Sequence, residues 1–416
     1  MLTRGSVVVF LRRGHHQLIT DGPGPDVGSG VSNSGTKAET SPARAAVEQI
    51  ASAMAVAAAA WLESLDADQR RVAHWKSADD DAAETERLRW YYTPTDHGGL
   101  PLDRQRPAQA SRAMRLLASG LSTPGYVTVC TVMGWENVLD HLEGFSVTWD
   151  RERGRDPGQY RLRVFGDPGG REPWGWRFGG HHVSLNNLIV NGRVEAVTPC
   201  FIGADPAAAP LLGPATLRPL GTAEDLARDL VRSLPPPLRE RAVLLDRAPS
   251  DIIGGNRTRL ADGDQMLPLT DIWRGRFTDP RLDELVTGLS RNAEEQAGLT
   301  AADHRRLALT TRPPGLAARE LNGGQREVLA TLLATYTGRV PDGLAPAVDL
   351  DAVHLAWAGS TEPGQPHYYR LQAPRLLVEW DNTARGANHA HSVWRNPQAD
   401  FGLDALRAHR ATHHAG

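Results

Sequence analysis

The stretch from residue 367 to residue 394, HYYRLQAPRLLVEWDNTARGANHAHSVW, combines strand-like sequence with a concentration of imidazoles and carboxylates. HYYRLQ and RLLVEWD have the aromatic and β-branched composition that favours strands. Because side chains alternate between the faces of a strand, the two carboxylates of VEWD lie on one face, and an extended NHAHS places its two histidines on one side. The titratable residues concerned are His367, Glu379, Asp381, His389 and His391.

A second block of strand-like sequence lies upstream, between residues 145 and 203. Apolar and polar residues alternate in FSVTWDRE, YRLRVFG, WGWRFGGHHVSLNNLIV and GRVEAVTPCFIG, and the turn-forming runs RDPGQ, GDPGG and NG separate them. This pattern is typical of antiparallel strands with short connections. Asn191-Gly192 is the clearest hairpin turn, because both residues tolerate the positive φ that a two-residue turn requires.

Helical sequence precedes and separates the two blocks. Residues 45–65 are rich in alanine, a strong helix former. Val132, Trp135, Leu139 and Leu142 recur at the spacing of one buried helix face. Further helices are expected over residues 82–88, 107–119, 122–144, 279–290 and 323–338.

One more helix is expected after the first strand block. Thr222 and Asp225 have the spacing of a capping box, which predicts that a helix begins at Thr222. Pro235, Pro236 and Pro237 are expected to end it.

These patterns predict an α+β fold. The order of helices, strands, helices, strands lacks the regular βα alternation of a parallel sheet. We therefore expect a mixed, mainly antiparallel sheet built from two distant strand blocks, about 145–203 and 352–395, packed with helices. Residues 43–416 are expected to form a single α+β domain. Residues 1–42 are expected to form a flexible arm, because their Gly, Ser and Pro content buries too little apolar surface to offset ordering entropy.

Composition restricts the partners and the location. The 416 residues carry a net charge of −3, with 40% hydrophobic and 23% charged residues, so nothing indicates the basic patch of a nucleic-acid-binding protein. Cys130 and Cys200 are the two cysteines, both in apolar surroundings, and they predict buried free thiols rather than a disulfide framework. The apolar run SVVVFL is shorter than a signal-peptide core, and no window was expected to reach a membrane span of about 20 apolar residues. A cytoplasmic protein without a nucleic-acid or membrane partner is expected.

Clustered histidines predict a metal site. Read as one strand, WGWRFGGHHVSLN directs His182 to one face and His181 to the other, so that only one of the pair would line a given cavity. A His-x-His pair, a third histidine and a carboxylate are a common ligand set for Fe, Cu, Mn or Zn. The predicted ligands of one transition-metal ion are His181, His182, His389, His391 and Glu379.

Other residues are predicted to act on the substrate. Asp381 is a candidate catalytic carboxylate, and Arg177 and Arg395 could bind a carboxylate or phosphate of a small-molecule substrate. The wall of the pocket is expected to consist of Trp174, Trp176, Trp380 and Trp394. Two alternatives stay open: the histidines are hydrogen-bonded members of a polar core, or one is the general base of a metal-free site in which Arg177, Arg370 or Arg395 holds an anion.

Several long motifs resemble a family of bacterial and fungal proteins, domain of unknown function 3500. They include WYYTP, WGWRFGGHHVSLN, TPCFIGADPA, APSDI and EWDNTARGANHAHSVWRNPQADFG, and the likeness covers about residues 45–412. The family pattern pairs a GHH-SLN segment with a terminal NHxH-S-WR segment. The resemblance implies an identity and no reaction.

The functional hypothesis that we favour is a metal-dependent enzyme, an oxidoreductase or oxygenase that acts on a small polar or anionic molecule. Imidazole-rich sites without a recognisable hydrolytic motif suit redox metals. The alternatives are a metal-dependent hydrolase and a non-catalytic protein that binds a small ligand. Neither the substrate nor the oligomeric state follows from the sequence.

Overall fold

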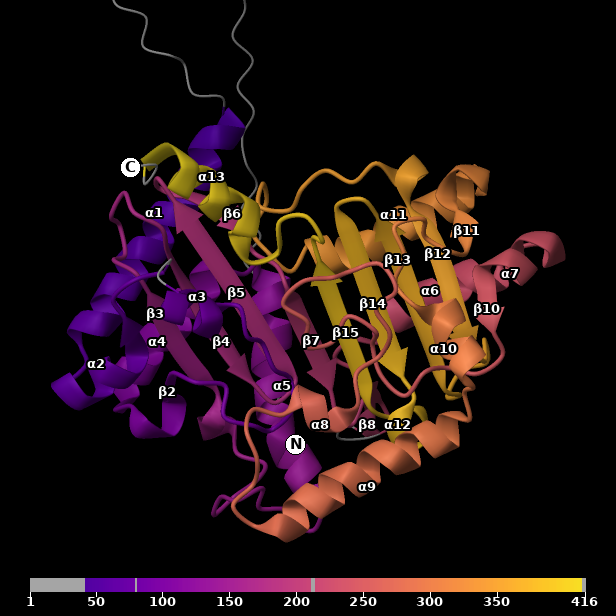
Figure 1. Ribbon diagram of the computed structural model, residues 1–416, viewed down its shortest axis with the longest axis horizontal. Coiled ribbons are helices and arrows are strands. Elements are labelled where there is room, and N and C mark those ends of the chain that lie inside the picture. The colour runs from indigo at the N-terminus through magenta and orange to yellow at the C-terminus, as the bar shows by residue number, and fades with distance from the viewer. Residues whose placement is uncertain (1–41, 79–80, 211–213, 414–416) are drawn as a thin grey trace, which may run out of the picture. The chain divides into compact units, whose positions relative to one another are not determined.

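The computed structural model describes residues 42–78, 81–210 and 214–413 (Figure 1). The chain divides into two units, Met1–Thr40 and Ser41–Gly416. The arm predicted at residues 1–42 lies outside the described residues except for Pro42, which begins the first helix.

Most strands of the described residues belong to one thirteen-stranded sheet, in the order β1-β3-β4-β5-β7-β15-β14-β13-β12-β10, with β2, β6 and β11 attached beside this path. The pairings are mainly antiparallel; β1 with β3 and β10 with β12 are parallel. The predicted α+β fold is confirmed. The strands are β1 (His74–Trp75), β2 (Leu100–Pro101), β3 (Arg161–Phe165), β4 (Trp174–Gly180), β5 (Val183–Val190), β6 (Arg193–Ala196), β7 (Cys200–Ala204), β8 (Ala209–Pro210), β9 (Thr216–Leu217), β10 (Val243–Leu245), β11 (Leu316–Ala317), β12 (His354–Gly359), β13 (His367–Ala373), β14 (Leu376–Asn382) and β15 (Ala390–Arg395).

Helices pack on the sheet and lie across its ends. The helices are α1 (Pro42–Glu63), α2 (Ala67–Ala73), α3 (Asp81–Arg87), α4 (Pro107–Ser119), α5 (Thr123–Leu142), α6 (Gly221–Arg232), α7 (Pro236–Ala242), α8 (Leu269–Ile272), α9 (Pro280–Ala297), α10 (Ala301–Leu307), α11 (Gly323–Thr337), α12 (Ala384–Ala387) and α13 (Leu403–His413). Short 3₁₀ turns are η1 (Leu102–Arg104), η2 (Pro157–Gln159), η3 (Ala318–Glu320), η4 (Leu350–Ala352) and η5 (Asp400–Gly402). Figure 1 shows α9 running across one end of the sheet.

The two strand blocks meet where β7 pairs with β15. The pairing is antiparallel, with His391 opposite Gly203 and Ser392 opposite Ile202. Because β5 pairs with the other edge of β7, the turn that precedes β5 lies next to the start of β15. This junction brings the GHH and NHAH sequences together.

The main hydrophobic core lies on one face of the sheet. Side chains of α1, α4, α5, α6 and α11 pack there against tryptophans of β4, β12, β14 and β15. Smaller apolar clusters lie elsewhere; one contains Trp90, Tyr92, Phe201 and Val393. Cys200 belongs to the main core, whereas Cys130 is only half-buried; both thiols are free, as predicted.

Two segments of the first block differ from the predicted strands. Residues 145–152 contain no strand, because Phe145, Trp149 and Asp150 adopt φ values of 57°, 51° and 59°, which break the extended backbone. The run WGWRFGGHHVSLNNLIV is two strands, β4 and β5, joined by a turn at His181-His182. Both differences affect the candidate site.

Helix ends differ from the sequence-based expectations in two places. Thr222 does not cap α6: the helix begins at Gly221, and the carboxylate of Asp225 accepts hydrogen bonds from Arg218 instead of from the backbone. Leu142 is 60% exposed rather than buried, because α5 ends there.

Helix α1 includes a segment, Arg44–Glu63, that is long and apolar enough to cross a membrane by length and composition. The expectation that no window reaches this limit is therefore wrong. Met54 and Trp61 of this helix are fully buried in the main core, and α1 packs against α4. Buried core helices pass the same test, so the segment alone does not indicate a membrane span.

The hairpin predicted at Asn191-Gly192 joins β5 to β6. The two φ values are 50° and 71°, as a type I′ turn requires. We expect Gly192→Ala to lower the free energy of unfolding by about 1 kcal/mol, because a Cβ is strained in this conformation. Among the described residues nothing lies within 4 Å of such a Cβ, so the effect comes from the backbone alone. Chemical denaturation of both proteins measures the difference.

Gly134 provides the matched control. It lies inside α5, where an added Cβ also meets nothing within 4 Å among the described residues. Gly134→Ala should raise the free energy of unfolding by about 0.5–1 kcal/mol, because alanine is the better helix former. A stabilising effect of Gly192→Ala would contradict the assignment of the turn.

Candidate metal centre

Three histidines from the two strand blocks converge. His182 lies in the turn between β4 and β5, His389 immediately precedes β15, and His391 lies within it. The ring centroids are 4.8 Å apart for His182 and His389, 4.7 Å for His389 and His391, and 5.3 Å for His182 and His391. His389 and His391 therefore lie on one side of the chain, as the alternation in NHAHS predicts. His182 of the upstream His-His pair contacts both of them.

A left-handed turn directs His182 into the cluster. Its φ is 63°, a conformation that costs free energy for a residue with a Cβ. Two backbone hydrogen bonds hold it: the N–H of His182 donates to the carbonyl of Tyr92 (3.0 Å), and Gly203 N–H donates to the carbonyl of His182 (2.8 Å). A Cβ at Gly203 would lie 2.7 Å from Cδ2 of His182, so glycine leaves room for the imidazole.

Nitrogen atoms of the cluster face one another while carboxylates lie behind them. Nε2 of His182 lies 2.8 Å from Nε2 of His389. Nδ1 of His391 lies 2.8 Å from Asp251 and 3.3 Å from Asp381, and Nδ1 of His389 lies 3.6 Å from Asp205. A carboxylate on the far nitrogen is the usual outer partner of a metal-binding histidine, because it fixes the ring and raises its basicity.

The three histidines can therefore hold one metal ion. Their ligand atoms all lie within 4.8 Å of one another. A tetrahedral ion with bonds of about 2.0–2.1 Å keeps its nitrogen ligands roughly 3.3 Å apart. The two Nε2 atoms, which at 2.8 Å are within hydrogen-bond distance, would move apart slightly to hold it. Since Nδ1 of His391 is engaged by two carboxylates, its Nε2 is the nitrogen left for the ion.

Two further groups of the described residues could each bind an ion and adjoin the first. Glu136 Oε1 lies 2.6 Å from Nδ1 of His181, and these two residues form a group with His182. Asp251, Asp381 and His391 form the other. His181 and His182 stack with centroids 3.8 Å apart, so all three groups share one continuous cluster.

Burial sets the protonation of most of these groups. It lowers the pKa values of His181, His182 and His389 well below the ordinary value, so these imidazoles are neutral, the state that binds metals. For His391 burial also acts downward, but Asp251 and Asp381 outweigh it and raise the pKa to about 10. Burial raises the pKa of Glu136 to about 8, against the opposing effect of Arg155.

The cluster opens into a cavity of about 950 Å³. Its lining includes His181, His182, His389 and His391, together with the acids Asp205, Asp251 and Asp381. Tyr92 also lines it and donates a hydrogen bond to Asp251 (2.9 Å). A bound ion would thus be accessible to a small molecule.

Comparison with known families identifies the chain. The family described as "Protein of unknown function (DUF3500)" matches residues 47–403. The chain belongs to this family. The resemblance inferred from the motifs is thereby confirmed, and both ends of the histidine cluster fall inside the matched region. No curated protein and no solved structure matches the chain.

Both members of the paired histidines of this DUF3500 chain line the cavity. Only one was predicted to do so, because the segment was expected to be a single strand with side chains on alternate faces. The turn at His181-His182 interrupts that strand, so both side chains reach the cavity. Glu379, a predicted ligand, belongs to none of the metal-capable groups of the described residues. It accepts hydrogen bonds from the N–H groups of Ile253 and Gly254 and from the hydroxyl of Tyr368, and so fixes the loop next to Asp251.

The two arginines proposed as substrate anchors are not among the residues that line the cavity. Arg395 is fully buried; it donates to Asp400 (2.7 Å) and to the carbonyl of Gly254 (2.8 Å), and its guanidinium lies 5.5 Å from the centre of the Trp90 ring. Arg177 donates to the carboxylate and backbone of Glu86 and to two further carbonyls. These contacts give both side chains a structural role.

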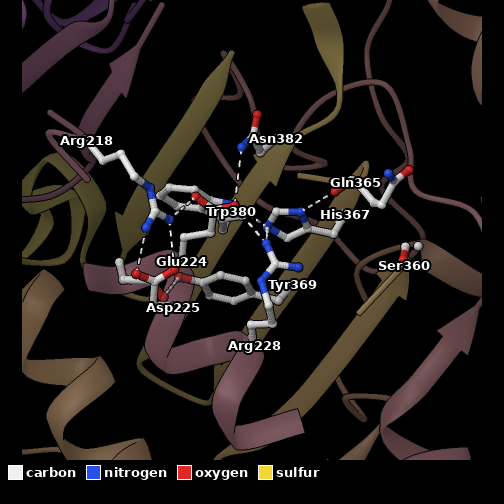
Figure 2. A network of polar contacts seen from close by, with 12 residues as sticks. Arg218, Glu224, Asp225, Arg228, Ser360, Gln365, His367, Tyr369, Trp380 and Asn382 are labelled. Carbon is white, nitrogen blue, oxygen red and sulfur yellow. Dashed lines mark hydrogen bonds and ion pairs between the residues drawn. The ribbon is translucent and has the colours of Figure 1, made fainter. Parts of the chain in front are cut away.

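His367 and the four predicted wall tryptophans occupy the helix-covered face of the sheet. Trp174, Trp176, Trp380 and Trp394 belong to the main core, and none lines the cavity. Figure 2 shows His367 beside Trp380, whose indole N–H donates to Nε2 of His367 (3.1 Å), while Nδ1 lies 2.9 Å from the carbonyl of Gln365. Burial lowers the pKa of His367 to about 4, so it is a neutral, hydrogen-bonded core histidine.

Three acids of the centre were missed by the sequence reading. Asp205 follows β7, Asp251 lies in a loop and Glu136 lies in α5, so they share no local pattern. Asp205 and Asp251 do occur in TPCFIGADPA and APSDI, two of the motifs that resemble the family. The presence of these two acids in motifs of the family was the signal that could have identified them as candidate site residues.

The buried cluster around Arg177 gives a pH-dependent prediction. Glu86 contacts Arg163, Arg177 and Arg274 at 3.0, 2.8 and 2.9 Å. Burial acts to raise the pKa of Glu86, but the arginines outweigh it and lower the pKa overall. Glu86→Gln should lower the free energy of unfolding at pH 7 by about 3 kcal/mol, because buried charges lose their partner.

The difference between the two proteins should shrink in acid. A depressed pKa stabilises the fold fully above the unfolded pKa of about 4.3, and this contribution is lost as pH falls through the lower, folded pKa. Denaturation curves at pH 7, 5 and 3 measure it. A difference that stays constant down to pH 3 would show that the charge of Glu86 does not stabilise the fold.

Proposed function

We propose that this chain is a metal-dependent enzyme in which His182, His389 and His391 bind one transition-metal ion beside a substrate cavity. The observation that carries the proposal is the convergence of the three imidazoles, with Nε2 of His182 and Nε2 of His389 2.8 Å apart and with carboxylates behind His389 and His391. The family assignment supplies no reaction, so the support comes from the site alone.

A polar core explains this arrangement less well. His367 shows what such a core looks like in this chain: Nδ1 faces the carbonyl of Gln365, Nε2 accepts from Trp380 and Arg228, and the side chain is not part of the cavity lining. The cluster at His182 instead places several imidazoles at the wall of a large cavity. His182 and His389 are neutral, and an ion bound at His391 would displace the proton that Asp251 and Asp381 keep on its ring. Imidazoles that converge at a cavity wall are an arrangement that binds ions.

We favour an oxidoreductase that acts on a small molecule. The ligand set is three imidazoles, with the carboxylates in the outer layer, and imidazole ligands suit iron and copper as well as zinc. Such an ion, when bound by His182, His389 and His391, would supply redox or oxygen chemistry beside the cavity. Asp205 orients the ring of His389, and Asp251 and Asp381 orient that of His391. Tyr92 orients Asp251 in turn, whereas His182 is held by its backbone hydrogen bonds.

A metal-dependent hydrolase is the second candidate, and Asp205 favours it. Its Oδ1 has no hydrogen-bond partner within the described part of the chain, although the residue is 3% exposed and lines the cavity. Burial raises its pKa to about 6, against the effects of Arg385 and Arg155, so it ionises within the range useful to a general base. Zinc as the bound ion would favour hydrolysis, whereas iron or copper would favour the oxidoreductase.

Metal content tests the centre directly. The purified protein should contain about one Fe, Cu, Mn or Zn ion per chain, and His389→Ala combined with His391→Ala should remove it, because two of three ligands are lost. Elemental analysis measures the ion, and circular dichroism checks the fold. His354→Ala, which changes a histidine of β12 outside the cavity, is the matched control and should keep the ion.

A metal-free protein that refuses added Fe, Cu, Mn and Zn would end the proposal, and so would full retention of the ion in the double variant. The non-catalytic binding protein would then be the better interpretation.

Asp251 provides a test of the carboxylates that lie behind the metal-binding histidines. It lies behind His391 and contacts no other ring of the trio. Asp251→Asn should weaken metal binding by roughly 10–100-fold, since outer carboxylates orient the ring and raise its basicity. Competition with a chelator of known affinity measures the change. Unaltered affinity would mean that Nδ1 of His391 does not depend on this carboxylate.

A further inference from the structure

The loop at residues 145–156 borders the cavity in an unusual backbone conformation. Phe145, Trp149 and Asp150 all have positive φ, which is rare for residues with large side chains. Gly154 N–H donates to the carbonyl of Val147 (2.9 Å) and Thr278 N–H donates to the carboxylate of Asp150 (2.7 Å), which hold this conformation. The result is that Trp149 and Arg155 both reach the cavity wall.

Arg155 has a donor without an acceptor. The residue is 5% exposed; its Nε and Nη2 donate to the carboxylate of Glu143 at 2.7 and 2.9 Å. Its buried Nη1 has no hydrogen-bond partner among the described residues. Leaving a buried charged donor unpaired is costly. An acceptor supplied by a molecule in the cavity would remove that cost.

Two indoles extend the same surface. Trp149 and Trp273 line the cavity with ring centroids 5.2 Å apart, and the Nε1 of each has no partner within the described residues. The guanidinium of Arg155 lies 5.6 Å from the centre of the Trp149 ring. Phe277 packs 4.8 Å from Trp273 and fixes its plane. Three N–H donors and two aromatic faces are therefore contiguous.

The wall farther along is apolar. Leu285, Val286 and Leu289 of α9 line the cavity, and Leu285 and Leu289 remain 47% and 43% exposed. In Figure 1 this helix crosses the end of the sheet, and the cavity that it lines is also lined by the histidines. The cavity wall therefore includes both N–H donors and apolar side chains.

We propose that Arg155, Trp149 and Trp273 bind the carboxylate and the ring of an aromatic acid, which is the substrate class of this cavity. A carboxylate offers two oxygens with about four acceptor positions, enough for the three free N–H groups. It carries one charge, whereas a phosphate would bring more negative charge next to Glu143 and Asp205. The paired indoles accept a flat apolar ring by stacking. The inference rests on the proposed function only in that the metal-binding histidines line the same cavity.

Calorimetry with benzoate tests the site. Benzamide, which lacks the charge, and acetate, which lacks the ring, are the matched probes. We compare the wild type with Arg155→Lys, which keeps the positive charge near Glu143 but removes Nη1, and with Trp149→Phe combined with Trp273→Phe, which keeps the rings but removes both N–H groups. Trp176→Phe is the control, because its Nε1 also lacks a partner among the described residues but lies outside the cavity. Each protein is measured metal-loaded and after chelation.

Benzoate should bind more tightly than either probe, and each test variant should weaken it by about tenfold or more, since hydrogen bonds to charged groups have this magnitude. The control should bind like the wild type, with and without the ion. The assignment would be overturned if benzoate did not bind, or if both test variants bound it as the wild type does. It would also be overturned if binding required the ion and was unaffected by Arg155→Lys. Arg155-dependent binding in a protein that takes up no metal would instead overturn the proposed function and keep this site.

Discussion

The backbone pairing of β7 with β15 is the interaction on which the rest of the structure depends. Each block of strands is built from neighbours in sequence, and this antiparallel ladder is what makes them one sheet. It also fixes the register, with His391 opposite Gly203. A slip of one residue would turn His391 to the helix-covered face and Trp394 to the other, because strand side chains alternate. Core packing of the tryptophans and the position of the histidines are therefore set by the same pairing.

The sequence predicts the architecture well where patterning is local and repetitive. The α+β class, the two strand blocks, the hairpin at Asn191-Gly192 and the helix that begins after Ser122 all follow from periodicity and turn chemistry. The sequence-based prediction fails where the composition of a segment is compatible with more than one backbone conformation. FSVTWDRE has strand composition, yet it forms the loop that carries Trp149 to the cavity, because three of its residues adopt positive φ that no composition signals.

The candidate site is predictable in its imidazoles and not in its acids. HxH spacing and a His-His pair identify four histidines, and the structure brings them into one cluster. Glu379 and Asp381 alternate correctly onto one face, but only Asp381 reaches His391; Glu379 instead caps the loop that carries Asp251. Asp205, Asp251 and Glu136 come from a strand end, a loop and a helix. Their convergence is a product of tertiary packing that no single segment encodes.

The long separation in sequence between β7 and β15 has a consequence for biosynthesis. Ribosomes make β3 to β7 long before residues 390–395 exist, so the nascent sheet must keep the open edge of β7 without its final neighbour. Unpaired edges are templates for pairing with other chains. Cys200, Phe201 and Ile202 lie along this edge, and it is covered only once residues 390–395 have been made. The histidine cluster therefore assembles only after this pairing, and chains truncated before residue 390 would expose the edge of β7 to other chains and would lack His391.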